Sequence, residues 1–257
     1  MINRKTERKS LRDIAVKYRT YIKKLSASLP ELAGQVQTLV DRRDGPSYTV
    51  LKPVVYNEAL DEKNALNTIR MILVADNPGR REQEQGRYLV GPSGKIAEKF
   101  FRDNPELGID FRKNVLVLNK TPIHTPRTGE LKELCRIGAG PGKGVCAAAV
   151  ESSQKFMADL LHEFWQSCRR PVWIIGYSEM KKGGIFEAYT EKLKCLCASN
   201  PAFKKSIFFY RHFSMNQFTI DLRKQAAPCE TPAQTLERIG EAYRRRVLGQ
   251  EAEPVLV

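Results

Sequence analysis

Histidine, cysteine and long apolar runs are scarce in this sequence. It has three His and six Cys among 257 residues, and no two cysteines are spaced Cys-x-x-Cys. So few cysteines exclude a disulfide scaffold, and we expect reduced thiols and no metal site. No window approaches about 18 uninterrupted apolar residues, and the first residues lack the apolar centre of a secretory signal. These absences predict a soluble cytoplasmic protein with no membrane partner.

Acidic residues are outnumbered by basic ones. The chain has 43 Lys and Arg against 29 Asp and Glu, a formal net charge of +14. Such an excess is typical of proteins whose partner is a polyanion. Part of it is local, because residues 1–24 carry nine basic and two acidic side chains while apolar residues recur there at helical spacing. This predicts a basic amphipathic helix, with three roles open: a docked helix with a solvated outer face, a nucleic-acid grip, or a membrane-surface helix.

Four short apolar runs alternate with helical patterns. The runs cover residues 71–75, 115–118, 172–175 and 207–210. Between them, apolar residues recur about every four positions, as on the buried face of a helix. Strands that alternate with helices predict parallel βαβ units. We therefore expect an α/β fold of three layers, α/β/α, around a central four-stranded parallel sheet.

The chain contains no internal repeat and no low-complexity linker that would divide it. We expect residues 1–45 to form a basic helical extension and residues 46–257 to form one α/β domain. Thr231 is followed by Pro232 and Gln234, a capping-box pattern that predicts a final helix.

Polar residues follow three of the predicted strands. Asp76 and Asn77 precede a Pro-Gly turn after the first strand, Asn119 ends the second, and His212 follows the fourth. The carboxyl ends of parallel strands lie at one edge of a sheet, where open α/β folds bind their ligands. Taken separately, each residue is equally consistent with an ordinary turn or a structural hydrogen bond and with a functional role. Together they predict one site assembled from several strand ends.

This constellation resembles the uracil-DNA glycosylase superfamily. Residues 75–79 (Ala-Asp-Asn-Pro-Gly) are similar to its first motif, Gly-x-(Asp/Asn/Ala)-Pro-(Gly/Tyr), in the Asn-Pro-Gly version of the mismatch-specific and single-strand-selective branches. Residues 86–94 (Gly-Arg-Tyr-Leu-Val-Gly-Pro-Ser-Gly) resemble a loop of the thermostable branch. Residues 117–119 match the strand whose asparagine reads uracil, and residues 212–214 resemble the His-Pro-Ser motif. The resemblance covers roughly residues 70–222.

The resemblance implies a monofunctional DNA glycosylase of base-excision repair that flips the damaged nucleotide and directs water to C1′ of the sugar. His212, as a neutral imidazole, would donate a hydrogen bond to the uracil carbonyl, where negative charge develops. Asn77 would orient the water through its carbonyl oxygen. Asp76 is the other candidate, as a general base, and we favour Asn77 because successive side chains usually diverge.

Substrate recognition would come from four residues. The Asn119 amide can donate one hydrogen bond and accept another, which complements the edge of uracil and not that of cytosine. Tyr88 or Leu89 would cover the flipped base, and Tyr88 offers the better π-face. Ala75 stands where the superfamily usually has glycine, which reduces the space near the nucleotide.

DNA contacts would come from loops at the same edge. Ser93 and Lys95 open a predicted helix whose N-terminus would bind a phosphate. Ser214, Met215 and Asn216 lie where the superfamily carries its wedge, and Met215 is the apolar side chain suited to filling the space of an extruded base.

Several positions depart from the family pattern. Phe213 replaces the proline of His-Pro-Ser, and no cysteine precedes Cys135, so the iron–sulfur cluster of the thermostable branch is not expected and we expect no cofactor. The partner is then DNA containing a damaged base, bound by a monomer. Residues 138–144 are glycine-rich, but their spacing fails the phosphate-loop pattern by one residue, which favours a basic loop along the DNA. Because of Ala75 and Phe213, the alternative is a catalytically inactive, nucleic-acid-binding protein.

Overall fold

The computed structural model describes residues 4–45, 47–62, 65–137 and 144–249. Its longer elements follow in chain order: α1 (Arg4–Ser28), α2 (Leu32–Asp44), β1 (Met71–Ala75), α3 (Arg80–Gln85), α4 (Pro92–Asp103), α5 (Phe111–Asn114), β2 (Val115–Asn119), α6 (Glu130–Leu134), α7 (Val145–Cys168), β3 (Val172–Ile175), α8 (Glu187–Ser199), α9 (Pro201–Ser206), β4 (Ile207–Tyr210), α10 (Gln217–Gln225) and α11 (Pro232–Leu248). The glycine-rich loop expected to follow DNA lies, but for Gly144, outside the described residues.

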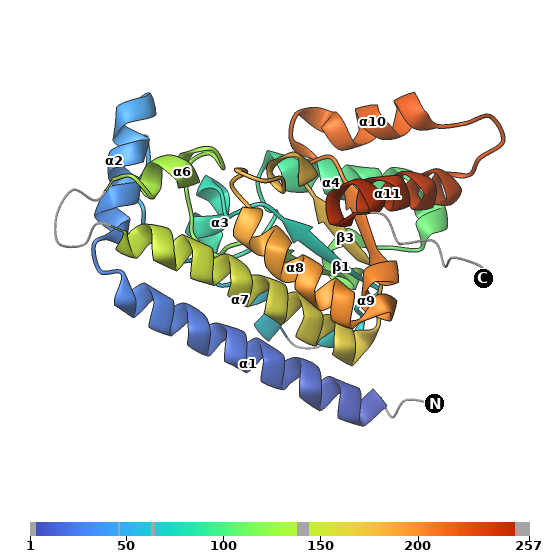
Figure 1. Cartoon of the computed structure of the whole chain (residues 1–257), viewed down its shortest axis with the longest axis horizontal. Coiled ribbons are helices and arrows are strands. Elements are labelled where there is room, and N and C mark those ends of the chain that lie inside the picture. The colour runs from blue at the N-terminus through green and yellow to red at the C-terminus, as the bar shows by residue number, and fades with distance from the viewer. Residues whose placement is uncertain (1–3, 46, 63–64, 138–143, 250–257) are drawn as a thin grey trace, which may run out of the picture.

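The four predicted strands form one all-parallel sheet in the order β2-β1-β3-β4. Every residue of β1 and β3 is buried, as expected for strands covered on both faces. Figure 1 shows the sheet between the helices, and the fold class predicted from the sequence is confirmed. Because the strands are parallel, all four carboxyl ends lie at one edge.

Two apolar clusters cover the two faces of the sheet. Alternate β1 residues divide between them: Ile72 and Val74 face the cluster that includes α7 and α8, whereas Leu73 and Ala75 face the cluster that includes α4. Two helices, α4 and α11, begin where the sequence predicts. Pro92 occupies the first turn of α4, and Thr231 forms the capping box of α11 with Gln234.

The basic N-terminal segment is a helix that packs along α7 (Figure 1). Its apolar face is buried in the same cluster as the sheet, through Leu11, Ile14, Tyr18, Ile22 and Leu25. Its basic side chains from Arg12 to Lys24 lie largely on the outer face. This arrangement corresponds to a docked helix with a solvated outer face, while the boundary at residue 45 stays a prediction. Among the described residues, no helix combines the length and apolar character needed to cross a membrane.

Candidate active site

A pocket of about 520 Å³ lies at the carboxyl edge of the sheet. We call it the strand-end pocket. It takes residues from the turn after β1, the loop before α4, the segment 125–128, and the segment after β4. Of the residues predicted from the sequence, it contains Ala75, Asp76, Asn77, Leu89, Ser93, His212 and Ser214. Its lining also includes three exposed cations, Arg80, Arg81 and Arg127.

Asn77 has a side-chain orientation fixed by its hydrogen bonds. Its Nδ2 donates to the Ile123 carbonyl oxygen at 3.2 Å and to Thr125 Oγ1 at 2.9 Å. The Thr125 hydroxyl in turn donates to the Arg127 carbonyl oxygen, so it accepts from the amide. Both N–H groups of Asn77 are therefore used, and Oδ1 is left as its acceptor for a group in the pocket.

His212 has a defined tautomer. The Ser214 backbone N–H, which can only donate, bonds to Nδ1 at 3.0 Å. Nδ1 is therefore unprotonated and the neutral ring carries its proton on Nε2. Burial lowers the pKa of His212, with Lys120 acting in the same direction and Asp76 against them. In the neutral ring Nε2–H is therefore the donor, while its role toward a substrate stays a prediction.

Asp76 pairs with a lysine that the sequence analysis did not single out. Lys120 is fully buried, and its Nζ lies 2.5 Å from Asp76 Oδ1 and 2.6 Å from the Ile175 carbonyl oxygen. Burial lowers the pKa of Lys120. Gly176, with φ of +76°, allows the close approach, because a Cβ there would collide with the Asp76 carboxylate. A lysine after a strand is ordinarily solvated, so no pattern in the sequence marks this ion pair.

Asn119 is the last residue of β2 and pairs in register with Ala75 of β1. Alternation along the strand puts its side chain on the same face of the sheet as Ala75, which lines the pocket. Its side chain is buried, 1% exposed, and neither Oδ1 nor Nδ2 has a partner among the described residues. A buried amide without partners costs free energy, which is typical of a group that binds a ligand. Asn119 does not itself line the pocket surface in this conformation.

Tyr88 and Leu89 point to different places. Tyr88 is buried outside the pocket, where its hydroxyl donates to the Val55 carbonyl oxygen at 2.6 Å and bonds to the Tyr18 hydroxyl of α1. The expectation that the tyrosine offers its face to a base is not met by this placement. Leu89, in a left-handed conformation with φ of +49°, lines the pocket instead.

Glu82 joins the turn after β1 to the Leu89 segment. Its carboxylate accepts the Gly79 N–H and the Leu89 N–H, and Arg112 donates to the Leu89 carbonyl oxygen at 2.7 Å. Burial raises the pKa of Glu82 to about 7, opposed by these two backbone N–H groups. The position of Leu89 thus depends on a carboxylate at the start of a helix six residues long, which the sequence analysis did not identify.

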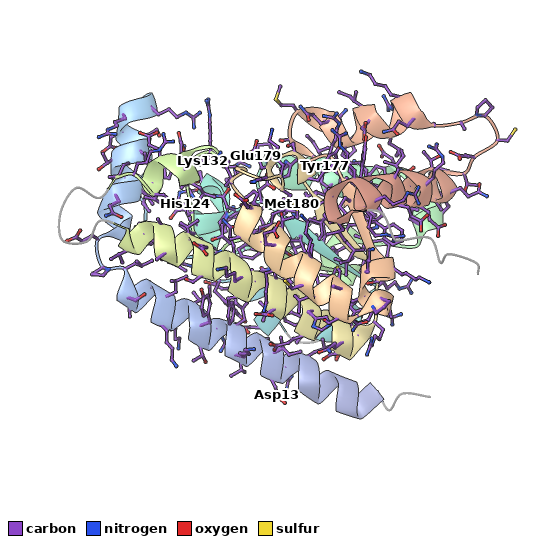
Figure 2. The ribbon with its side chains drawn as sticks, viewed as in Figure 1. Asp13, His124, Lys132, Tyr177, Glu179 and Met180 are labelled. Carbon is purple, nitrogen blue, oxygen red and sulfur yellow. The ribbon has the colours of Figure 1, made fainter. Side chains whose placement is uncertain are left out.

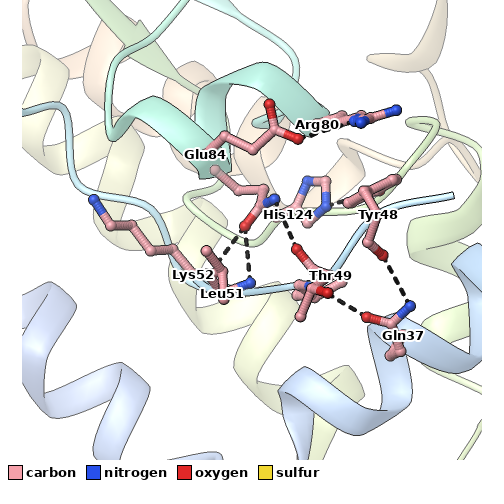
Figure 3. A network of polar contacts seen from close by, with 10 residues as sticks. Gln37, Tyr48, Thr49, Leu51, Lys52, Arg80, Glu84 and His124 are labelled. Carbon is pink, nitrogen blue, oxygen red and sulfur yellow. Dashed lines mark hydrogen bonds and ion pairs between the residues drawn. The ribbon is translucent and has the colours of Figure 1, made fainter. Parts of the chain in front are cut away.

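His124 contacts the same turn, and Figure 3 shows it close to Tyr48 and Arg80. Its Nδ1 donates to the Pro78 carbonyl oxygen at 2.8 Å, and its Nε2 accepts from the Tyr48 hydroxyl at 3.1 Å. Burial lowers the pKa of His124 to about 4. Arg80 lies over the Tyr48 ring, 4.8 Å from its centroid. The turn at residues 77–79 is consequently held by Glu82 at Gly79 and by His124 at Pro78.

The segment after β4 has one buried side chain, Phe213, and one strongly exposed side chain, Met215. Phe213 is fully buried and stacks on Phe218 with centroids 4.4 Å apart, so this side chain belongs to the core and not to the pocket. Met215 is 83% exposed, and both Met215 and Asn216 have left-handed backbones, with φ of +53° and +56°. Consecutive non-glycine residues in this region are strained, a feature common at functional sites.

Lys95 is exposed on α4 and does not line the pocket, whereas Ser93, in the first turn of α4, does.

Among the described residues, no three His, Cys, Asp or Glu side chains lie close enough together to hold a metal ion. A scan against protein-family models found no match to this chain, and a search of curated proteins found none either.

Proposed function

We propose that this protein is a monofunctional DNA glycosylase that removes uracil or a related deaminated base. One observation carries the proposal: Asn77 and His212, from the ends of different strands, line the same pocket with a free acceptor on one and a free donor on the other. A hydrolytic N-glycosylase needs an acceptor for the attacking water and a donor for the departing base.

In the proposed reaction, the bond between the base nitrogen and C1′ breaks and its electron pair leaves with the base. The Nε2–H of His212 donates to the base carbonyl, where the negative charge accumulates. Water, aligned by Asn77 Oδ1, adds its oxygen to C1′, and its surplus proton neutralises the base. The products are the free base and an abasic sugar. The ion pair with Lys120 occupies Asp76 Oδ1, which favours Asn77 over Asp76 as the group that orients water.

Base selection is assigned to Asn119. An amide with an unused donor and acceptor matches the carbonyl and N–H of uracil, and its buried atoms would gain the partners they lack. Because Asn119 is 1% exposed, the base reaches it only if the residues that cover it move aside. Leu89 then supplies the apolar cover, while Met215 occupies the vacated space in the duplex.

The test is alkali cleavage of a labelled oligonucleotide with a single uracil, after incubation with the purified protein. His212→Asn keeps an oxygen close to the Nδ1 position for the Ser214 N–H and removes the Nε2 donor, so we expect kcat to fall about 100- to 1,000-fold. Asn77→Ala should lower kcat at least about 100-fold. Asn104→Ala removes an amide bonded to the Phe100 carbonyl on α4, outside the pocket, and serves as the matched control.

Binding of the oligonucleotide without any abasic product, on uracil, hypoxanthine and xanthine substrates alike, would contradict the proposal. That result would establish the inactive, nucleic-acid-binding alternative. Equal activity of the wild-type protein and His212→Asn would also contradict the assigned mechanism.

A further inference from the structure

A second cavity, of about 780 Å³, lies beside the strand-end pocket. We call it the cationic groove. It is bounded by η4 (Tyr177–Glu179) and the residues after it, by α8, by Arg211, and by the end of α11. Figure 2 shows Tyr177 and Met180 of this region on the side of the molecule away from Asp13 of α1. Arg211 lines the groove and the next residue in the chain, His212, lines the pocket, so the end of β4 contributes to both cavities.

Positive charge dominates the lining of the groove. Five cationic side chains line it, from Lys181, Lys182, Lys194, Arg211 and Arg246. The lining has two carboxylates, and both are engaged: Glu187 accepts the Gly183 N–H at 2.9 Å, and Glu191 pairs with Lys194 at 3.1 Å.

Three of the cations are available to a ligand. Lys181, Lys182 and Arg246 are exposed, and none has an ion-pair partner among the described residues. Arg211 lies 3.5 Å from Asp221 and is partly neutralised. Long, flexible, unpaired cations along an open groove suit a chain of spaced negative charges better than a single small anion, which needs a preorganised site.

We propose that the cationic groove binds the phosphodiester backbone of the nucleic-acid strand whose base enters the strand-end pocket. Because Arg211 of the groove and His212 of the pocket are consecutive residues, a strand whose base enters the pocket has a neighbouring phosphate within reach of the groove. A membrane surface is the poorer partner, since insertion at an interface needs apolar side chains beside the basic ones. The exposed large apolar residues of the described chain are Val16, Leu51, Val145, Met215 and Ile220, and none of them lines the groove.

The identity of the strand rests on the proposed function, but binding can be tested apart from base release. The probe is an undamaged, fluorescein-labelled single-stranded 20-mer, and anisotropy gives its affinity across a salt series. Each phosphate contact contributes about −0.7 to the slope of log K against log salt for single strands. The triple variant Lys181→Ala, Lys182→Ala and Arg246→Ala should therefore show a slope shallower by about 2.

The matched control is Arg12→Ala, Lys23→Ala and Lys24→Ala, which removes the same charge from exposed positions on α1. It should leave the slope unchanged, and the thermal melting of both variants should match the wild type. An unchanged slope in the groove variant, or an equal change in the control, overturns the inference. So does a groove variant that loses binding only to phosphatidylserine vesicles.

Base release separates the two proposals. At saturating uracil-containing DNA the groove variant should keep the wild-type kcat while its KM rises. If the wild type releases no base but the groove variant loses salt-dependent binding, the proposed function fails and the groove inference stands. If base is released and the slope does not move, the groove inference alone fails.

Discussion

Replacing Lys120 by methionine tests the buried ion pair beneath the pocket. Methionine keeps an unbranched apolar stem of similar length, so the main loss is the charge. The substitution leaves the Asp76 carboxylate without its cation and the Ile175 carbonyl oxygen without its donor. Breaking one side of a buried pair costs about 3–5 kcal/mol of unfolding free energy. A domain of ordinary stability, about 5–15 kcal/mol, should remain folded.

The measurement is urea unfolding, in which a loss of about 4 kcal/mol lowers the midpoint by roughly 1–2 M at an m-value of about 2–3 kcal/mol/M. The same substitution is also made in an Asp76→Asn protein, in which no carboxylate is left without its cation. There Lys120 is itself a buried charge without its partner, so Lys120→Met should cost at most about 1–2 kcal/mol, from the Ile175 carbonyl. Lys95→Met, at an exposed position on α4, is the control and should change stability by less than about 0.5 kcal/mol.

A cost of Lys120→Met below about 1 kcal/mol would show that the pair contributes little. Equal costs in the two backgrounds would show that Asp76 and Lys120 are not coupled. Either result would refute the account of how the turn after β1 is held against β2 and β3.

Three further predictions concern other parts of the site. His124 is buried with its pKa lowered to about 4, so between pH 6.5 and 4 the unfolded chain binds more protons than the folded chain. The stability advantage of the wild type over His124→Gln should therefore shrink by about 3 kcal/mol as pH falls through that window. A constant difference would refute this. Met215→Gly should remove the proposed wedge with less than about 1 kcal/mol change in stability, because glycine accepts the left-handed backbone. Under the proposed function, base release from duplex DNA should then fall while release from single strands persists, and Met215→Leu should retain both. Gly94→Ala should destabilise the protein by about 1–3 kcal/mol in thermal unfolding, because the added methyl group collides with the Leu89 carbonyl oxygen; wild-type stability would contradict that close packing.

The strands and the edge that carries the site follow from local patterns. Four apolar runs, each too short for a buried helix and separated by helical periodicity, become β1 to β4 within one residue of the predicted bounds. Parallel pairing then brings Asn77 and His212 to one pocket, although 135 positions separate them in the chain. Strand periodicity also puts Asn119 and Ala75 on one face, because the side chains alternate.

The order of the elements, the fold class and the segments that reach the carboxyl edge therefore follow from the amino-acid pattern. The directions of the side chains in the loops at that edge follow only from the packing of the folded chain. Tyr88 points away from the pocket because its hydroxyl has buried hydrogen-bond partners at Val55 and Tyr18. Lys120 is buried because its ammonium group bonds to Asp76 and the Ile175 carbonyl oxygen. Such orientations depend on hydrogen bonds between residues that are distant in the chain. A local pattern of apolar and polar residues does not predict these hydrogen bonds.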